Sequence, residues 1–450
     1  MEAVEQIPVS SPAPSGKLLR VLGVGFGLAI AIGATIGVGI LRNPGAVAAQ
    51  LGSYWPIMIA WVLGGVYSVL GANYLAELAS MTPKAGGFYV HAHRAFGNYG
   101  GFVVGWSDWA NNTLAGAYIA VVFGEYAGGL FLPGQPYGRV VCSVAVLALI
   151  AGINFVGVRS GSGVQKLTSL LKALALLAFV VVCFVYGSAT SAAAGAVAEP
   201  AFRPNGLGAS VIAFVLAFQV ILGTYDGYYN PIYFAEEDID PARNIARSMF
   251  GGIVLVTLIY VLVNAALLYV LPMSKLAASQ FAGGDAMALI FGERAGQIVT
   301  VLALLSLIGI INAVMMSTPR IMFALSRDGL FTAKAEEVNK GGTPAVALAI
   351  TAICTIALAS VGSFELLLAI GQFFLVVIMI LLVVALFTLR RREPDAPRPF
   401  RTWGYPFAPL LMLIIAVLLF VGYAISNPFP SALAAGALLL SYPIYRVMKS

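Results

Sequence analysis

Twelve long apolar segments constrain the fold of this chain more than any other feature. A helix needs about 20 mostly apolar residues to cross the hydrocarbon core of a bilayer. Hydrophobic residues make up 60% of the 450 residues and charged residues only 10%, whereas a soluble domain has about 25% charged residues. The sequence therefore predicts an all-α integral membrane protein. Its twelve expected transmembrane helices are 21–50, 54–80, 96–131, 139–157, 164–187, 209–235, 249–271, 296–325, 344–361, 364–389, 404–426 and 429–446.

Lys and Arg residues predict the orientation, because basic loops stay in the cytoplasm. With a cytoplasmic N-terminus, most of the 25 Lys and Arg residues are cytoplasmic. The basic residues then expected outside are Arg42, Arg139, Arg203, Lys275 and Arg294. We expect both termini in the cytoplasm. This sorting explains the pI of about 9.1 without a nucleic-acid partner.

Glycines interrupt the first and sixth segments at matching places. Gly33 and Gly37 lie in "GATIGVGIL", and Gly223 and Gly227 have the same spacing in "LGTYDGYYNP". A G-x-x-x-G pattern also occurs on helix-dimer faces. However, interrupted spans at corresponding positions of two halves point to the binding site of a transporter. We therefore predict discontinuous helices 1 and 6.

The position of the sixth segment predicts two inverted repeats of five spans, because an odd number of spans precedes it. The expected divisions are a cytoplasmic tail (1–20), a first repeat (21–187), an external linker (188–208), a second repeat (209–389), a basic cytoplasmic loop (390–403) and two further spans (404–450).

The two breaks suggest a ligand with both charges of a zwitterion. Backbone N–H groups at the start of a half-helix suit a carboxylate, and in span 1 these belong to Gly37, Val38 and Gly39. Carbonyl oxygens at the end of a half-helix suit an ammonium group, and the residues around Gly223 offer them in span 6. This pattern favours an α-amino acid.

Four stretches resemble the amino acid–polyamine–organocation superfamily, especially bacterial relatives of L-type amino acid transporter light chains. They are "AIGATIGVGILRNPG", "YLAELASMTPKAGGFYVHAHRAFG", "YDGYYNPIYFAEEDIDPARNI" and "PRIMFALSRDGLF". The resemblance implies a LeuT-like five-plus-five inverted repeat, alternating access, and a bacterial inner membrane location. Some relatives need a partner subunit linked through an external cysteine. No cysteine lies in a predicted external loop here, so we expect no obligatory partner subunit.

The resemblance also implies which residues line the substrate. The carboxylate side would be Thr35, Ile36, Gly37, Val38 and Gly39, and the side of span 6 would be Gly223, Thr224, Tyr225, Asp226 and Gly227. Relatives often place a bulky aromatic gate at the position of Gly223. Either Tyr225 or Tyr228 replaces this gate, or the space admits a larger substrate side chain.

Lys172 lies six residues deeper in the fifth span than Lys166, which can reach water near the helix end. A charge at membrane depth costs at least about 2.5 to 3.5 kcal/mol and indicates a functional role. Lys172 also resembles the lysine that replaces sodium in proton-coupled and sodium-independent relatives. It either exchanges a proton during transport or stays charged, with Ser306 and Asn312 as candidate partners.

Other polar residues leave alternatives open. Asp226 either favours a cationic substrate, pairs with a cation during gating, or caps the second half of helix 6. The residues Asp108, Asn111, Asn112 and Glu125 of span 3 either face the cavity or join helices. The residues Glu236, Glu237, Asp238, Arg243 and Arg247 form either solvated ion pairs or an inner gate.

The remaining chemistry argues against catalysis. His91 and His93 fall in a predicted polar connection, and Cys142, Cys183 and Cys354 lie in apolar runs, so we expect no metal site and no cofactor. No His pairs with a nucleophile inside a span, which disfavours an intramembrane enzyme. A channel is disfavoured because paired breaks suit one occluded ligand. The sequence thus predicts a secondary transporter of small or medium neutral L-amino acids, by proton symport or exchange. The alternative substrate is a polyamine or cationic amino acid.

Overall fold

The computed structural model describes residues 18–193 and 206–449. The regular secondary structure of these residues consists of α-helices and 3₁₀ helices, with no β-sheet. The α-helices are α1 (Val24–Thr35), α2 (Gly39–Leu51), α3 (Tyr54–Met81), α4 (Phe88–Phe131), α5 (Gly138–Val156), α6 (Val158–Ala193), α7 (Leu207–Tyr225), α8 (Pro241–Val270), α9 (Met273–Ala278), α10 (Ala282–Phe291), α11 (Glu293–Arg327), α12 (Ala345–Val361), α13 (Phe364–Arg392), α14 (Phe407–Ser426) and α15 (Pro428–Lys449). The 3₁₀ helices are η1 (Asn230–Phe234) and η2 (Ala333–Glu336).

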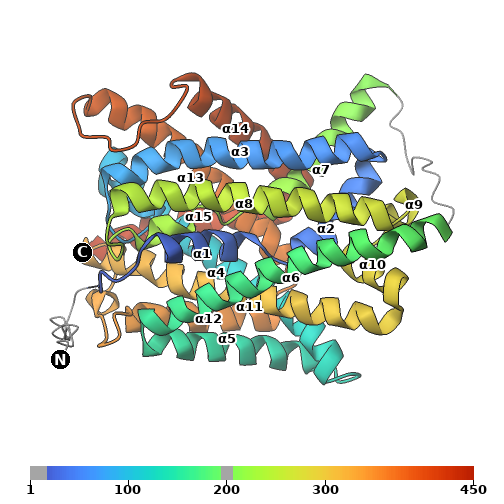
Figure 1. Cartoon of the computed structure of the whole chain (residues 1–450). Helices are drawn as coiled ribbons and strands as arrows, with labels where there is room; N and C mark the ends of the chain where they lie inside the picture. The colour runs from blue at the N-terminus through green and yellow to red at the C-terminus, as the bar shows by residue number, and fades with distance from the viewer. Residues whose placement is uncertain (1–17, 194–205, 450) are drawn as a thin grey trace, which may run out of the picture.

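The long helices lie side by side in one bundle, and α1 begins at the same end at which α15 finishes (Figure 1). Within the described residues, ten helices are long and apolar enough to cross a membrane, and the bent pair of α1 and α2 adds an eleventh. The chain is therefore a multi-pass membrane protein. The one expected span that remains, the ninth (344–361), corresponds to α12, an apolar helix of 17 residues that is shorter than the helices that cross as single spans.

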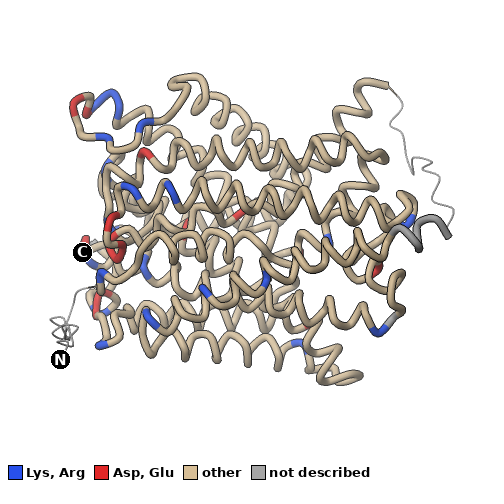
Figure 2. The backbone as a smooth tube through the Cα atoms, in the orientation of Figure 1, with Lys and Arg blue, Asp and Glu red and all other residues tan. Residues whose placement is uncertain are grey.

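Lys, Arg, Asp and Glu residues gather mainly at the end of the bundle where α1 begins, which we call the charged end (Figure 2). Away from this end the long helices are mainly apolar, as membrane-spanning helices are. Residues 1–17 of the predicted tail (1–20) and 194–205 of the predicted linker (188–208) lie outside the described residues, while 188–193 continue α6.

The histidine pair lies on a helix, so the predicted connection at His91 and His93 is wrong. Helix α4 begins at Phe88, earlier than the predicted border at 96, after a turn at Gly86 and Gly87. Both glycines have positive φ, and a Cβ at Gly87 would lie 2.1 Å from the ring of Tyr233. The helix direction changes at Gly97, whose φ is 77°.

Candidate functional site

The breaks in spans 1 and 6 begin at the same point relative to their glycine pairs. Helix α1 ends at Thr35 and α7 at Tyr225, each two residues after the first glycine of the pair. The next residues, Ile36 and Asp226, both have extended backbone, with ψ of 103° and 146°. Helix α2 then starts at Gly39, bent by 45° from α1, whereas only the short η1 follows α7. The predicted discontinuities are therefore present in both spans.

The two breaks lie against each other. A Cβ on Gly227, whose φ is 110°, would lie 2.7 Å from the carbonyl oxygen of Ala34. The Asn43 side chain of α2 donates a hydrogen bond of 2.7 Å to the Thr224 hydroxyl. The Tyr260 hydroxyl of α8 lies 3.0 Å from the carbonyl oxygens of both Thr35 and Thr224. Asn43 and Tyr260 therefore hold the ends of the two half-helices together.

The buried side chain of Lys172, on α6, reaches the break in span 1. Its ammonium nitrogen lies 2.6 Å from the carbonyl oxygen of Gly33, 2.6 Å from that of Ile36 and 3.4 Å from that of Ser306. Three acceptors match the three N–H donors of an ammonium group. The arrangement therefore favours the charged amine in this conformation.

Asn312 is not a partner of Lys172, which corrects that expectation. Its side chain donates to Gln165 at 2.8 Å and accepts from Asn154 at 2.9 Å. Ser306 approaches Lys172 only through its backbone carbonyl. Asn312 instead joins α11 to α5 and α6 beside the break.

Unpaired backbone donors line the start of α2. Among the described residues, no hydrogen-bond acceptor is found for the N–H groups of Gly37, Val38 and Gly39. Val38 and Gly39 are half-buried, while Thr35 and Ile36 are buried. Unpaired N–H groups at the start of a helix attract an anion such as a carboxylate. The five residues predicted in span 1 are thus contiguous, but only Val38 and Gly39 are partly accessible.

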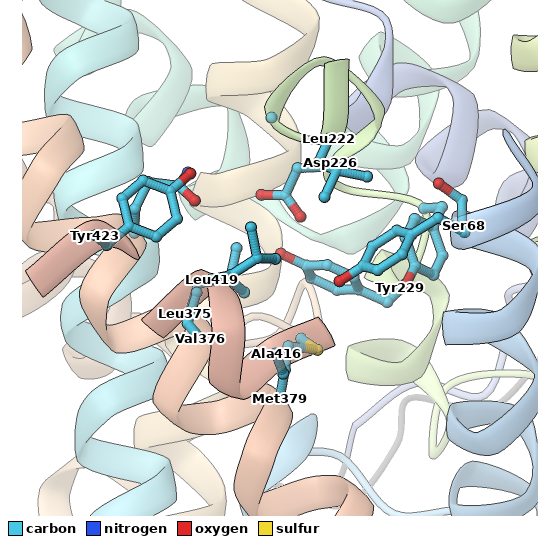
Figure 3. Close-up of a pocket in the computed structure, with 14 residues that line it drawn as sticks. Ser68, Leu222, Asp226, Tyr229, Leu375, Val376, Met379, Ala416, Leu419 and Tyr423 are labelled. Carbon is cyan, nitrogen blue, oxygen red and sulfur yellow. The ribbon is translucent and has the colours of Figure 1, made fainter. Parts of the chain in front are cut away.

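Asp226 and Gly223 line a cavity next to the break in span 6 (Figure 3). The Asp226 carboxylate points into this cavity, whose walls come from α3, α7, α13 and α14. No heavy atom lies within 4 Å of a Cβ built on Gly223. The position at which the resemblance predicts an aromatic gate is therefore open space here.

Tyr225 does not fill that space. Its hydroxyl donates to the carbonyl oxygen of Trp61 at 2.9 Å, and its ring packs against Trp61 and Tyr260. Tyr228 does line the cavity and is buried. Of the two tyrosines considered as replacements for the gate, only Tyr228 lies at the cavity in this conformation.

Asp226 does not cap a helix. The residue before η1 is Tyr229, and no side chain caps η1. Asp226 follows the end of α7, where a negative charge is unfavourable beside the helix carbonyls. The capping interpretation is therefore wrong, and the carboxylate lies at the cavity, where the Tyr229 side chain and the backbone N–H of Gly227 interact with it.

Two polar residues of span 3 join helices. The Tyr233 hydroxyl of η1 donates to Asp108 at 2.7 Å, and the Asn112 side chain donates to the same oxygen at 2.8 Å. Asn111 is buried near Gly371 of α13. Glu125 is exposed, so its predicted contact with the cavity or a neighbouring helix is wrong.

The acidic residues after span 6 do not form solvated pairs with Arg243 and Arg247, which are exposed. Glu237 is buried and forms an ion pair with the buried Arg320 of α11. Its backbone carbonyl accepts from the N–H of Leu22, just before α1, at 2.9 Å. Local spacing could not identify Arg320, because it lies far away in the chain. These contacts join spans 1, 6 and 8 at the charged end.

No cluster that could hold a metal ion is found among the described residues. Cys142, Cys183 and Cys354 are free thiols, and His93 lies 3.4 Å from Asp328. The polar groups near the breaks are thus mainly backbone groups, one ammonium and one carboxylate. Such groups can bind and orient a small charged molecule.

Known proteins match nearly the whole chain. The family model described as "Amino acid permease" matches residues 27–445. The serine/threonine exchanger SteT of Bacillus subtilis is 28% identical over 96% of this chain and 97% of its own length. The b(0,+)-type amino acid transporter 1 of Mus musculus is 29% identical over 93% of this chain and 85% of its own. The branched-chain amino acid permease BcaP of Bacillus subtilis is 28% identical over 90% and 89%. The chain therefore belongs to the amino acid permease family.

Proposed function

We propose that this permease is a secondary active transporter of small or medium neutral L-amino acids, working by alternating access through proton symport or exchange. The observation that carries the proposal is the juxtaposition of the two breaks. Unpaired N–H groups of Gly37, Val38 and Gly39 suit the substrate carboxylate. The carbonyl oxygens at the end of α7, around Gly223, suit its ammonium group.

The relatives support this substrate class. SteT is described as a serine/threonine exchanger and BcaP as a branched-chain amino acid permease. The open space beside Gly223 would receive the substrate side chain, because the side chain is the part in which amino acid substrates differ in size. The same comparison favours transport over catalysis, since the relatives are transporters.

The proposed architecture has twelve spans in two inverted repeats, 21–187 and 209–389, with 404–450 outside them. The charged end would face the cytoplasm of a bacterial cell, because Lys and Arg gather there. In this arrangement both termini are cytoplasmic. The Glu237–Arg320 pair would act as the inner gate, and no partner subunit is required.

A cationic amino acid or polyamine is the second candidate substrate. One observation favours it: the Asp226 carboxylate points into the cavity and caps no helix. A buried or half-buried carboxylate stabilises a nearby cation. The two candidates differ in whether the substrate side chain is neutral or positive.

Counterflow in proteoliposomes tests both candidates. Vesicles loaded with unlabelled L-alanine receive trace labelled L-alanine outside, with single amino acids or putrescine as competitors. We expect transient accumulation of label that neutral L-amino acids block. A parallel set of vesicles is loaded with unlabelled arginine or putrescine and receives the same compound labelled. Absence of alanine counterflow together with robust arginine or putrescine counterflow would reject the neutral substrate and support the cationic one.

A further inference from the structure

Asp108 is a fully buried carboxylate that lacks a cation. Glu77 and Glu237 are equally buried, but Glu77 pairs with Arg390 and Arg398, and Glu237 pairs with Arg320. Among the described residues, no ion pair involves Asp108. Because a buried, unpaired carboxylate is costly, such a group tends to take up a proton. Asp108 therefore differs from Glu77 and Glu237 in what balances its charge.

The two oxygens of Asp108 are hydrogen-bonded unequally. Both the Tyr233 hydroxyl and the Asn112 amide contact Oδ1, at 2.7 and 2.8 Å. Oδ2 is buried and has no hydrogen bond of normal geometry among the described residues, and the backbone N–H of Phe88, at the start of α4, is the other donor that faces the carboxyl group. Since the contact with Tyr233 joins two oxygen atoms, it can form with the carboxyl group either ionised or protonated.

Asp108 contacts η1, a segment whose movement would change the surroundings of the carboxyl group. This segment directly follows the break in span 6. On its other side, η1 is held to α11, because the guanidinium of Arg320 lies 4.4 Å from the ring of Phe234 and pairs with Glu237. Opening the charged end requires η1 to separate from α4 or α11, which would change the surroundings of Asp108.

Few titratable groups face Asp108. Tyr229 and Tyr233 of span 6 interact with it electrostatically, and Asp226 acts on the same two tyrosines. Arg320 of α11 is engaged by Glu237. On α4 itself, His93 and Arg94 are directed toward Asp328 and Glu393. The nearby charges are thus negative or already paired, which favours a neutral Asp108.

We propose that Asp108 binds a proton in this conformation and releases it when η1 separates from α4, so that it couples proton movement to transport. The inference rests on the proposed function. On release, the carboxyl O–H bond breaks and the proton passes to water that enters between α4 and η1. Lys172 then keeps a constant charge, in agreement with its three carbonyl acceptors.

The test compares wild type with Asp108→Asn in proteoliposomes that contain a trapped pH dye. Asparagine keeps an oxygen that accepts from Tyr233 but cannot exchange a proton. For wild type we expect alanine influx to carry protons and to depend on pH. Asp108→Asn should retain counterflow within about twofold, lose proton movement and show a flat pH profile, since only the titrating group is removed. Asp395→Asn, on an exposed loop, is the matched control.

Two results would overturn the inference. In one, Asp108→Asn moves protons as well as the wild-type protein does. In the other, the wild-type protein shows counterflow but moves no protons at any pH. Wild type without counterflow would instead refute the proposed function, and the inference with it. If Asp108→Asn does not fold, Tyr233→Phe replaces it. That variant should keep the pH dependence but shift its midpoint to higher pH, because the ionised carboxylate loses a donor. An unchanged midpoint would contradict the assignment.

Discussion

The break in span 1 is held rigidly, whereas the break in span 6 has space around it. At the first, Lys172 occupies the carbonyl oxygens of Gly33 and Ile36, and a helix of 13 residues follows. At the second, a 3₁₀ helix of five residues follows, and Gly223 borders a cavity. The comparison teaches that two similar glycine patterns can serve different tasks. Span 1 would bind the invariant carboxylate of an amino acid, and span 6 would accommodate its variable part.

The largest expected effect comes from removing the cation of the rigid break. Lys172→Ala leaves the carbonyl oxygens of Gly33 and Ile36 buried without a donor, which costs about 1–3 kcal/mol for each group. We expect it to abolish transport while folded protein remains in the membrane. Counterflow and size-exclusion chromatography in detergent measure the two properties.

Lys166→Ala is the control for that variant, because Lys166 is exposed on the same helix. It should transport like wild type. Normal counterflow by Lys172→Ala would show that the charge at the break is dispensable and would remove the main difference between the two breaks.

Gly33→Ala and Gly223→Ala compare the corresponding glycines directly. A Cβ at Gly33 would lie 2.0 Å from Gln165 Nε2 and 2.3 Å from Ser169 Oγ, whereas nothing lies within 4 Å at Gly223. Overpacking costs about 1–3 kcal/mol, so Gly33→Ala should lower the melting temperature and reduce counterflow about tenfold or more. Gly223→Ala should change neither property beyond about twofold. Equal effects at both positions would contradict the asymmetry.

Tyr260→Phe tests the contact that joins the breaks. The hydroxyl lies 3.0 Å from the carbonyl oxygens of Thr35 and Thr224. Without it, a buried carbonyl oxygen has no donor, which costs about 1–3 kcal/mol of stability in this conformation. We expect about a fivefold to tenfold rise in the half-saturating alanine concentration. Tyr269→Phe, a partly exposed position on the same helix, is the matched control and should be neutral. An unaltered saturation curve for Tyr260→Phe would indicate that the breaks are held together without this contact.

Asp226→Asn should have the smallest effect on neutral substrates. Because Asp226 lines the cavity of span 6 and not the break in span 1, and because asparagine has nearly the same shape as aspartate, alanine counterflow should remain within about twofold of wild type. Competition by arginine or putrescine should weaken. A complete loss of alanine counterflow would place the carboxylate in the recognition of the common amino acid group.

The apolar segments and the glycine pattern predicted the helices and the position of both breaks, because membrane thickness and helix propensity act locally. The depth of Lys172 in span 5 indicated a functional role, whereas its place beside span 1 came from the family resemblance. Tyr260, Asn43 and Tyr233 had no distinguishing pattern, since their roles come only from tertiary contacts. Local spacing suggested Arg243 and Arg247 as partners of Glu237, but its partner Arg320 is distant in the sequence and is brought close only by the fold.

Competition by alanine analogues tests most directly whether the two breaks together bind a zwitterion. Labelled L-alanine counterflow is measured with excess L-alaninamide, which lacks the carboxylate, or propionate, which lacks the amine. We predict that neither analogue competes, whereas unlabelled L-alanine and other neutral L-amino acids do. Strong competition by either analogue would contradict the account, because one of the two breaks would then be unnecessary for binding.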